Sequence, residues 1–406
     1  MGAFPFNELL SLDKQRRELI SQNQQLKTKR NIVSIDIANK KRAGEDAGEL
    51  ISEMGKISDE IKENDDKTKS VEEKYREIAI TLPNFLDPDV PIGPDDSYNK
   101  VIETWGEPKK KDDMLDHIDL SSIFDLIDIE RAAKISGSRF YFLKRDLVRL
   151  NFALLSCGLD FLRNRGFVLI QPPYMLKKEA IGGAIIFSDF QDVIYKIQDE
   201  DLYLIGTSEH AMAAMHMGEI FSSQDLPIHY AGVSPCFRKE AGAHGRDTKG
   251  IFRVHQFDKV EQFVFCEPSE SKKEQDKLLA NSLEFMRQLG LPYRAVILSS
   301  GDMGKVMAKT VDVECWVPSQ GTYREMISCS NATDFQARSL GIKFRGKAHE
   351  ESQFVHTLNS TLIATARTLV PIMETYFREE TKTIEIPKIL QPYMAGQKEI
   401  QALAKR

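Results

Sequence analysis

The chain has 406 residues, with 55 lysines and arginines against 61 aspartates and glutamates and a formal net charge of −6. This length is typical of two or three domains, and a hydrophobic fraction of 41% is enough to bury a core. The acidic balance excludes a protein that coats nucleic acid through bulk positive charge, although a local basic patch is compatible with it. The sequence has no apolar run of about 18 residues and no signal or transit peptide, so we predict a cytoplasmic protein without a membrane span.

The five cysteines are scattered along the chain and include no CxxC pair and no histidine at a zinc-binding spacing. We therefore predict reduced thiols that pack in the core, and no zinc site. They are Cys157, Cys236, Cys266, Cys315 and Cys329.

Residues 1–82 predict a helical hairpin. Two stretches, separated by a short glycine-containing break at 44–48, carry apolar residues at alternating steps of three and four or at full heptad steps. Such a seam is typical of an antiparallel coiled coil, and each arm would be on the order of 50 Å long. The seam positions are Leu12, Leu19, Leu26 and Val33 in the first stretch, and Leu50, Met54, Ile57, Ile61, Val71, Tyr75, Ile78 and Leu82 in the second, with Asn64 and Thr68 as interruptions.

Basic residues concentrate along the outer half of this hairpin. The charge on a coiled coil is usually its solvated face, so the pattern alone leaves open whether these residues meet solvent or nucleic acid. They are Lys27, Lys29, Arg30, Lys40, Lys41 and Arg42.

Four prolines in PNFLDPDVPIGP (83–94) end the helical region and predict an extended linker over 83–110. The remaining domain, 111–406, mixes strand-like and helix-like stretches without a regular βαβ alternation, which favours an α+β fold with an antiparallel sheet. No dinucleotide-binding or Walker loop is present. The predicted strands include 139–143, 166–170, 227–233 and 262–266, and the predicted helices include 147–164, 272–289 and 358–380.

The stretch GVSPCFRKEAGAHGRDTKGIFRVHQFDKVEQFVF (232–265) predicts two strands joined by a loop rich in Gly, Arg and Lys. Arg238 follows directly after an apolar strand, where its planar fork of donors can clamp a phosphate, and Glu240 lies two residues further. From these residues alone, an ordinary surface hairpin remains an alternative.

Within this stretch, FRKEAG, GRD and FRVHQF closely resemble motif 2 of the class II aminoacyl-tRNA synthetases, and specifically of the seryl-tRNA synthetase family. Other segments resemble further marks of the family in the right order, and the resemblance covers essentially the whole chain. These segments are IQPPYML (170–176) for motif 1, GTSEHAM (206–212) for the serine-binding TxE loop, REMISCSNATDFQARSLGIKFR (324–345) for motif 3, and VHTLNSTLIATARTL (355–369), which completes it.

The resemblance implies an antiparallel class II sheet of six to eight strands with flanking helices, preceded by the coiled-coil hairpin. It implies a ligase that uses ATP to activate serine as seryl-adenylate and then transfers serine to the 3′ end of tRNA(Ser). Whether selenocysteine tRNA is also charged stays open.

For ATP, the resemblance implies that Arg238 binds the α-phosphate, that Glu240 reads the adenine amino group, and that Arg367 lies over the adenine and meets the γ-phosphate. Glu325 and Ser328 offer oxygen ligands that suit Mg²⁺. The implied catalytic residues are Arg238, Glu325 and Arg367, and the implied ATP-binding residues are Arg238, Lys239, Glu240, Val254, Phe257, Glu325, Met326, Ile327, Ser328 and Arg367.

For serine, the implied pocket combines two carboxylates with several hydroxyls, a set that fits a small zwitterion. A pocket that hydrogen-bonds the substrate hydroxyl is expected to reject alanine by roughly 10⁴ or more, whereas threonine must be excluded by tight packing. Many bacterial relatives carry Ser at the third position of the NST triplet, so whether Asn359 or Thr361 contacts serine stays open. The implied residues are Thr207, Ser208, Glu209, Arg238, Glu261, Asn359 and Thr361.

The resemblance also implies a homodimer formed through motif 1 and a coiled coil that grips the long variable arm of tRNA(Ser). Members of the family commonly carry a further segment before the first long helix, which leaves open that the N-terminus is trimmed. Two other hypotheses remain: a catalytically silent paralogue that binds tRNA or a partner, and a class II ligase for another small amino acid. The second is limited by the lack of a Cys/His zinc site such as threonine recognition tends to use.

Overall fold

The computed structural model describes residues 4–109, 114–240, 250–347 and 350–402. The chain divides into two compact units, Met1–Leu82 and Pro83–Arg406. Within the described ranges, no helix is long and apolar enough to cross a membrane.

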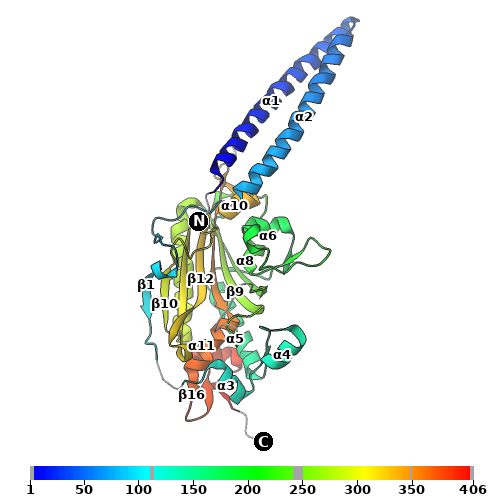
Figure 1. Ribbon diagram of the computed structural model, residues 1–406. Helices are drawn as coiled ribbons and strands as arrows, with labels where there is room; N and C mark the ends of the chain where they lie inside the picture. The colour runs from blue at the N-terminus through cyan, green and yellow to red at the C-terminus, as the bar shows by residue number, and fades with distance from the viewer. Residues whose placement is uncertain (1–3, 110–113, 241–249, 348–349, 403–406) are drawn as a thin grey trace. The chain divides into compact units, whose positions relative to one another are not determined.

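The first unit is a hairpin of two long helices, α1 (Phe6–Ala43) and α2 (Gly48–Ala79), which pack against each other (Figure 1). Gly44 ends α1 in the left-handed conformation, with φ of 75°, and its N–H bonds the carbonyls of Lys40 and Lys41. A residue without a Cβ adopts this conformation at little cost, which is why the chain can reverse here. The predicted coiled-coil hairpin is confirmed.

The seam of the hairpin changes character along its length. The half that includes the turn holds an apolar cluster, whereas the other half holds polar contacts: Asn23 donates to Asp65 at 2.6 Å, and the Arg16 guanidinium lies 5.0 Å from the centre of the Tyr75 ring. Asn23 is buried whereas Asp65 is exposed, and a polar residue in a coiled-coil seam helps to fix the register at a cost in stability. The apolar cluster comprises Leu26, Val33, Ile37, Ala47, Leu50, Met54, Ile57 and Ile61.

We therefore expect Ile57→Ala to destabilise the hairpin by about 2–4 kcal/mol, because Ile57 is 3% exposed and its loss leaves a cavity. Ile51→Ala, on the same helix at a position 45% exposed, is the matched control. Hydrogen exchange of the amides in α1 and α2 measures both. Equal protection in the two variants would contradict the assigned seam.

The second unit is built on an eight-stranded sheet with the order β1-β10-β11-β12-β15-β9-β8-β4 (Figure 1). Neighbouring strands are antiparallel except for β4 and β8, which are parallel. This agrees with the predicted α+β class. The strands are β1 (Lys100–Trp105), β4 (Val168–Ile170), β8 (Ile228–Phe237), β9 (Gln256–Cys266), β10 (Tyr293–Ile297), β11 (Lys309–Val317), β12 (Thr322–Thr333) and β15 (His356–Ala364).

Helices and short strands surround this sheet. The helices are α3 (His117–Phe124), α4 (Ile129–Ser136), α5 (Asp146–Arg163), α6 (Lys178–Ala184), α7 (Phe187–Phe190), α8 (Ser208–Ala214), α9 (Ser271–Leu289), α10 (Phe335–Leu340) and α11 (Thr365–Tyr376). The short strands are β2 (Ile127–Asp128), β3 (Phe142–Leu143), β5 (Met175–Leu176), β6 (Tyr203–Leu204), β7 (Ile220–Ser222), β13 (Lys343–Arg345), β14 (Gln353–Phe354), β16 (Phe377–Arg378), β17 (Thr383–Glu385) and β18 (Glu399–Gln401).

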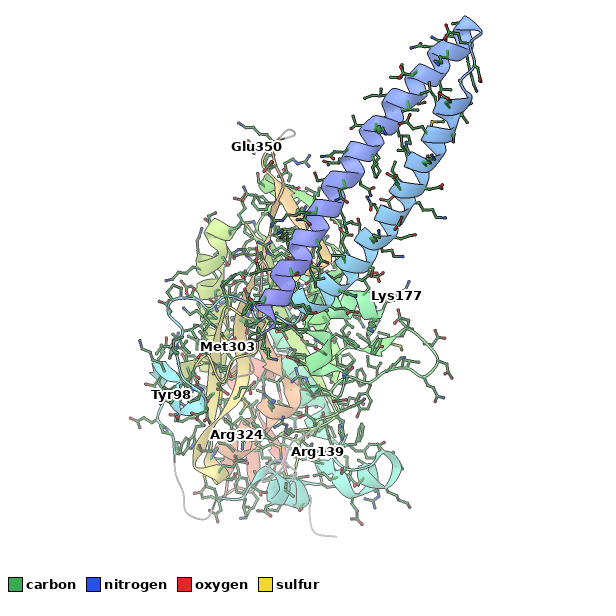
Figure 2. All side chains as sticks on the ribbon, turned by 45° about the horizontal axis from the view of Figure 1, so that its top comes forward. Tyr98, Arg139, Lys177, Met303, Arg324 and Glu350 are labelled. Atoms are coloured by element: carbon green, nitrogen blue, oxygen red, sulfur yellow. The ribbon has the colours of Figure 1, made fainter. Side chains whose placement is uncertain are left out.

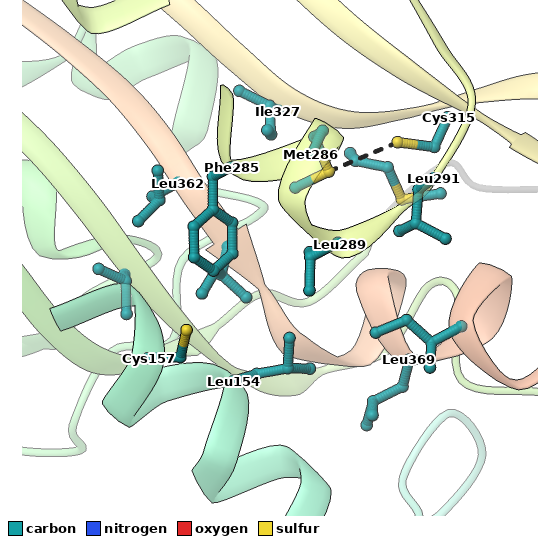
Figure 3. Packing of buried hydrophobic residues seen from close by; sticks show 14 of the residues in the cluster. Leu154, Cys157, Phe285, Met286, Leu289, Leu291, Cys315, Ile327, Leu362 and Leu369 are labelled. Atoms are coloured by element: carbon teal, nitrogen blue, oxygen red, sulfur yellow. Dashed lines mark hydrogen bonds between the residues drawn. The ribbon is translucent and has the colours of Figure 1, made fainter. Parts of the chain in front are cut away.

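One face of the sheet carries the main hydrophobic core. Side chains of α5, α9 and α11 meet alternate residues of β9, β11, β12 and β15 there, and Figure 3 shows Phe285 and Met286 of α9 between Cys157 of α5 and Cys315 of β11. Because successive side chains of a strand point to opposite faces, the intervening residues of the same strands face away from this core. Most of those residues are polar where β9, β11, β12 and β15 meet the site described below, whereas Phe263 and Phe265 of β9 belong to a second hydrophobic cluster.

Two segments differ from the sequence-based predictions. The stretch predicted as a linker supplies β1 to the sheet, and Asn84 donates to the carbonyls of Val306 and Ala332 at 2.9 and 2.7 Å, so the described part of 83–110 carries a strand and anchored turns. The helix predicted over 358–380 is wrong at its start, because residues up to Ala364 belong to β15. The residues of this strand are almost all buried, so its hydrophobic pattern resembles that of a buried helix.

Candidate active site

A cavity with a volume of about 260 Å³ lies over the polar face of the sheet. It gathers side chains from β9, β11, β12 and β15, from the start of α8 and α11, and from the segment that follows β8. Its lining includes Thr207, Glu209, Arg238, Phe257, Lys259, Glu261, Thr310, Glu325, Met326, Ser328, Ser330, Asn359, Thr361 and Arg367.

Arg238 lies at the point where β8 ends. The antiparallel register of β8 and β9 sets Cys236 opposite Phe257, so the residue two positions later comes to lie beside the Phe257 ring. The guanidinium carbon of Arg238 is 5.3 Å from the ring centre, and its Nε donates to the carbonyl of Gly206 at 3.1 Å. These contacts orient a cation toward the cavity, and the predicted strand, loop, strand hairpin is confirmed. Residues 245–247, the GRD triplet, lie outside the described residues.

Glu261 is the centre of a buried polar cluster. Its carboxylate has no exposed surface and forms an ion pair with Lys259, which lies two residues earlier on the same face of β9. It also accepts hydrogen bonds from Asn359 at 3.3 Å, Thr207 at 3.4 Å and Thr361 at 3.5 Å. A buried carboxylate is tolerable only with such partners, so this cluster is held in one arrangement before any ligand binds.

Because side chains alternate between the two faces of β15, Asn359 and Thr361 point to the same face. Both side chains line the cavity and both donate to Glu261, whereas Ser360 faces the opposite side and lies 3.1 Å from the hydroxyl of Ser282 on α9. The two candidates therefore occupy one face together, and either one or both can meet a ligand.

Glu209 is a second buried carboxylate in this part of the cavity. The Thr207 side chain caps α8 by accepting from the Glu209 N–H at 3.2 Å, and Gln336 donates to the Glu209 carboxylate at 3.0 Å. Burial, aided by the negative charge of Glu261, raises the pKa of Glu209 to about 7. The carboxylate is therefore ready to release its proton when a cation approaches.

The other end of the cavity is dominated by arginine. Arg367 donates to the Glu325 carboxylate at 2.9 Å, and its charge lowers the pKa of Glu325, so that Glu325 is ionised at neutral pH. Asp312 lies opposite Ser328 in the pairing of β11 and β12, and its Oδ1 has no hydrogen-bond partner among the described residues. Burial, together with the charge of Glu325, raises the pKa of Asp312 well above its usual range.

The side-chain oxygens of Glu325, Ser328 and Asp312 are the candidates for the expected Mg²⁺ site. Within the described residues, no three side chains of His, Cys, Asp and Glu are grouped to hold a metal by themselves. Glu325 and Ser328 nevertheless line the cavity, and Asp312, which pairs opposite Ser328, has an unpartnered oxygen next to them. Mg²⁺ is usually bound by one or two carboxylates together with water and substrate phosphates. The donor set therefore fits Mg²⁺ delivered with a nucleotide.

Five predicted residues lie elsewhere. Their side chains do not line the cavity. They could reach a ligand only through backbone atoms or after a change of side-chain conformation. Ser208 is buried against Gly232, and Lys239 is exposed with its ammonium 5.8 Å from the Tyr195 ring. Glu240 is paired with Arg253 at 2.5 Å. Val254 and Ile327 belong to the hydrophobic core, and Figure 3 labels Ile327 there.

Sequence reasoning missed Lys259 and Asp312. Both carry a signal, because KVE (259–261) and DVE (312–314) place charged residues two apart with an apolar residue between them, as expected for a strand with one polar and one apolar face. Charged residues are seldom buried in strands, so this spacing alone does not mark a site.

The basic residues of the helical hairpin differ in their surroundings. Lys29 pairs with Glu53 at 2.8 Å and Lys27 lies 3.9 Å from Asp65, so both contribute to contacts between the helices. Arg30 is half-buried at a seam position. Lys40, Lys41 and Arg42 are exposed in the last turn of α1, where positive charge also complements the helix dipole.

Comparisons with known proteins agree with this geometry. A seryl-tRNA synthetase N-terminal domain matches residues 3–86, and a tRNA synthetase class II core domain (G, H, P, S and T) matches residues 194–376. A serine–tRNA ligase of Nitrosopumilus maritimus is 53% identical over 398 residues, covering 98% of this chain and 94% of the relative. The chain belongs to the seryl-tRNA synthetase family.

Solved structures of the family have the same fold. The seryl-tRNA synthetase of Pyrococcus horikoshii, complexed with ATP, superposes with a TM-score of 0.89 at 43% identity and covers 98% of this chain and 93% of its own. The cytoplasmic serine–tRNA ligase of Naegleria fowleri, in complex with AMP, gives a TM-score of 0.85 at 36% identity, covering 98% and 92%. The predicted family and the class II fold are confirmed.

The raised pKa of Glu209 predicts a pH-dependent stability. A carboxyl that holds its proton more tightly when folded favours folding most below the unfolded pKa, and this contribution is lost as the pH rises to the folded value. Relative to Glu209→Gln, we expect the unfolding free energy of the unliganded protein to fall by roughly 3 kcal/mol between about pH 4.5 and 7. Urea unfolding of both proteins across this range measures it, and parallel curves would contradict the raised pKa.

Proposed function

We propose that the chain is a serine–tRNA ligase that activates L-serine with ATP and transfers it to the 3′ end of tRNA(Ser). The observation that carries this proposal is the division of one cavity into two chemical halves. Buried carboxylates and hydroxyls around Glu261 suit the ammonium and hydroxyl of serine, and the arginines Arg238 and Arg367 suit the phosphates of ATP.

In the nucleotide half, Arg238 binds the α-phosphate and stabilises the charge that grows there as the serine carboxylate attacks in line. Phe257, held beside Arg238, offers a flat face for adenine, and Arg367 meets the γ-phosphate. Glu325 and Ser328, with Asp312 beside them, would hold Mg²⁺ together with the phosphates, and the metal would supply further neutralisation of phosphate charge.

In the serine half, Glu209 and Glu261 bind the ammonium, and Thr207, Asn359 and Thr361 hydrogen-bond the substrate hydroxyl. These side chains are already held in place by Glu261, so they are preorganised for the substrate hydroxyl, and alanine, which lacks this hydroxyl, forgoes those hydrogen bonds and binds more weakly. Threonine adds one methyl group, which the packed cluster excludes sterically.

The helical hairpin grips the long variable arm of tRNA(Ser), and a homodimer forms through motif 1. The hairpin supports this proposal because Lys40, Lys41 and Arg42 are consecutive and exposed in the last turn of α1, next to the reversal. For the dimer, β4 is the last strand of the sheet, and Val168 is 55% exposed there. Five buried, free cysteines are compatible with the reducing cytoplasm.

Serine-dependent exchange of radiolabelled pyrophosphate into ATP tests the activation reaction. We expect exchange with serine and little with alanine or threonine. No exchange above background would favour the silent paralogue, and exchange that prefers another amino acid would favour a different class II ligase.

Arg238→Ala is expected to reduce this exchange by at least a hundredfold while the melting temperature stays near that of the parent, because only the phosphate cation is lost. Arg131→Ala is the control, since that side chain is 79% exposed on α4. Near-normal exchange by Arg238→Ala would show that the phosphate is held elsewhere.

Deletion of residues 21–69 is expected to spare exchange and abolish charging of tRNA. The contact of Asn23 with Asp65 shows that the two cut ends lie near each other, so the shortened hairpin can close.

Replacement of Lys40, Lys41 and Arg42 by alanine should raise the KM for tRNA and weaken its salt dependence. Unchanged charging of tRNA by the deleted form would show that the basic residues of the hairpin only form a solvated surface.

A further inference from the structure

A buried histidine and glutamate lie outside the cavity and have no part in the mechanism above. His117 is the first residue of α3 and is 5% exposed, and Glu374 of α11 has no exposed surface. The His117 N–H donates to the Glu374 carboxylate at 3.2 Å, and the Nδ1 atom of the ring lies 3.4 Å from the same oxygen. The second carboxylate oxygen accepts from the Ser319 N–H at 3.0 Å. Glu374 thus joins three separate segments.

The other ring nitrogen of His117 reaches the segment that leads into β9. The Ile251 N–H donates to Nε2 at 3.3 Å. Because Nε2 accepts this bond, the ring carries a proton on Nδ1, where it faces Glu374. The imidazole therefore connects a carboxylate on α11 to the backbone at Ile251.

The neighbouring glycine shows how closely the ring fits. Gly250 has φ of 77°, and a Cβ added there would lie 2.0 Å from the Nε2 atom of His117. No other residue fits this backbone without displacing the ring. The segment 250–252 is thus fixed by a hydrogen bond and by shape.

The next residue contacts the nucleotide arginine. The ring centre of Phe252 is 5.6 Å from the guanidinium carbon of Arg367 and 4.4 Å from that of Arg324, which Figure 2 labels. Such distances allow a cation–π contact that holds a guanidinium over a ring. Arg367 and Glu374 are about two turns apart on α11, so the contacts run from α11 through His117, Ile251 and Phe252 back to α11.

We infer that His117 and Glu374 are positioning residues for the activation reaction: they hold Ile251 so that Phe252 supports Arg367 against the phosphates of ATP. The inference rests on the proposed function. It assigns these two residues to the binding of ATP and not to that of serine. An experiment can therefore distinguish it from a general effect on stability, which would affect both substrates.

The test measures pyrophosphate exchange by the full chain with ATP and serine varied in turn. We expect His117→Ala to raise the KM for ATP about tenfold, the usual effect of one buried hydrogen bond left unmade, with the KM for serine within about twofold of the parent. His117→Gln can still accept from Ile251 and should restore much of the affinity for ATP. Gly250→Ala displaces the ring from the other side and should resemble His117→Ala.

His229→Ala is the matched control. His229 forms a similar pair with a buried glutamate, with Nε2 at 2.6 Å from Glu274, but this pair lies at the start of β8 and against α9. We expect a lower melting temperature and an unchanged KM for ATP. If His117→Ala fails to fold, Gly250→Ala gives the same readout, and His117→Gln remains the variant that restores the affinity.

Two outcomes would overturn the inference. One is a KM for ATP that stays at the parent value in His117→Ala or in Gly250→Ala. The other is an equal rise of the KM for ATP and for serine, which would mark a purely structural role. Absence of exchange in the parent protein is a separate result that would contradict the proposed function.

Discussion

Four neighbouring strands of the sheet turn apolar residues to the core and polar residues to the cavity, and the rest of the molecule depends on this constraint. In β9, for example, Val260 and Val264 pack into the core whereas Lys259 and Glu261 face the cavity. β11, β12 and β15 repeat the pattern. A shift of one residue in the register of any of these strands would bury its polar side chains among α5, α9 and α11 and place its core residues in the cavity. The same alternation therefore specifies the fold and assembles the site.

The buried charges explain why the two halves of the cavity differ. Glu261 has Lys259 and three hydrogen-bond donors, so it stays in place without a ligand, whereas Glu209 lacks a cation of its own and has its pKa raised to about 7. An arriving ammonium finds one carboxylate already ionised and a second that can release its proton. At the other end, Arg367 keeps Glu325 ionised and Asp312 keeps an unpartnered oxygen, which is the arrangement that a cation and phosphates can complete.

Much of the site could be predicted because its residues stand in short motifs whose spacing is visible in the sequence. Arg238, Glu325 and Arg367, and also Glu209, Glu261, Asn359 and Thr361, all line the cavity. Lys259 and Asp312 were missed because a buried charge is unfavourable unless it is compensated, and only the fold shows that both side chains are buried beside charged groups of the site. Ile327 was assigned to the site although the pleat of β12 turns it into the core, and the start of the helix predicted at 358 is a strand because neighbouring strands bond to it.

The contacts of His117 could not have been predicted from local patterns. The ring, Glu374 and Ile251 are far apart in the chain, and although Ile251 directly precedes FRVHQF, neither His117 nor Glu374 belongs to a recognised motif. Long-range hydrogen bonds of this kind depend on the complete fold. They show that the support of a site extends beyond the residues that line it.

A crystal structure with a non-hydrolysable seryl-adenylate analogue tests the central claim most directly. The account predicts the ammonium and hydroxyl of the serine moiety against Glu209 and Glu261, the linking group beside Arg238, and the adenine on the face of Phe257. An analogue bound with its seryl group away from Glu261, or bound outside the cavity, would contradict the division of the cavity into a serine half and a nucleotide half.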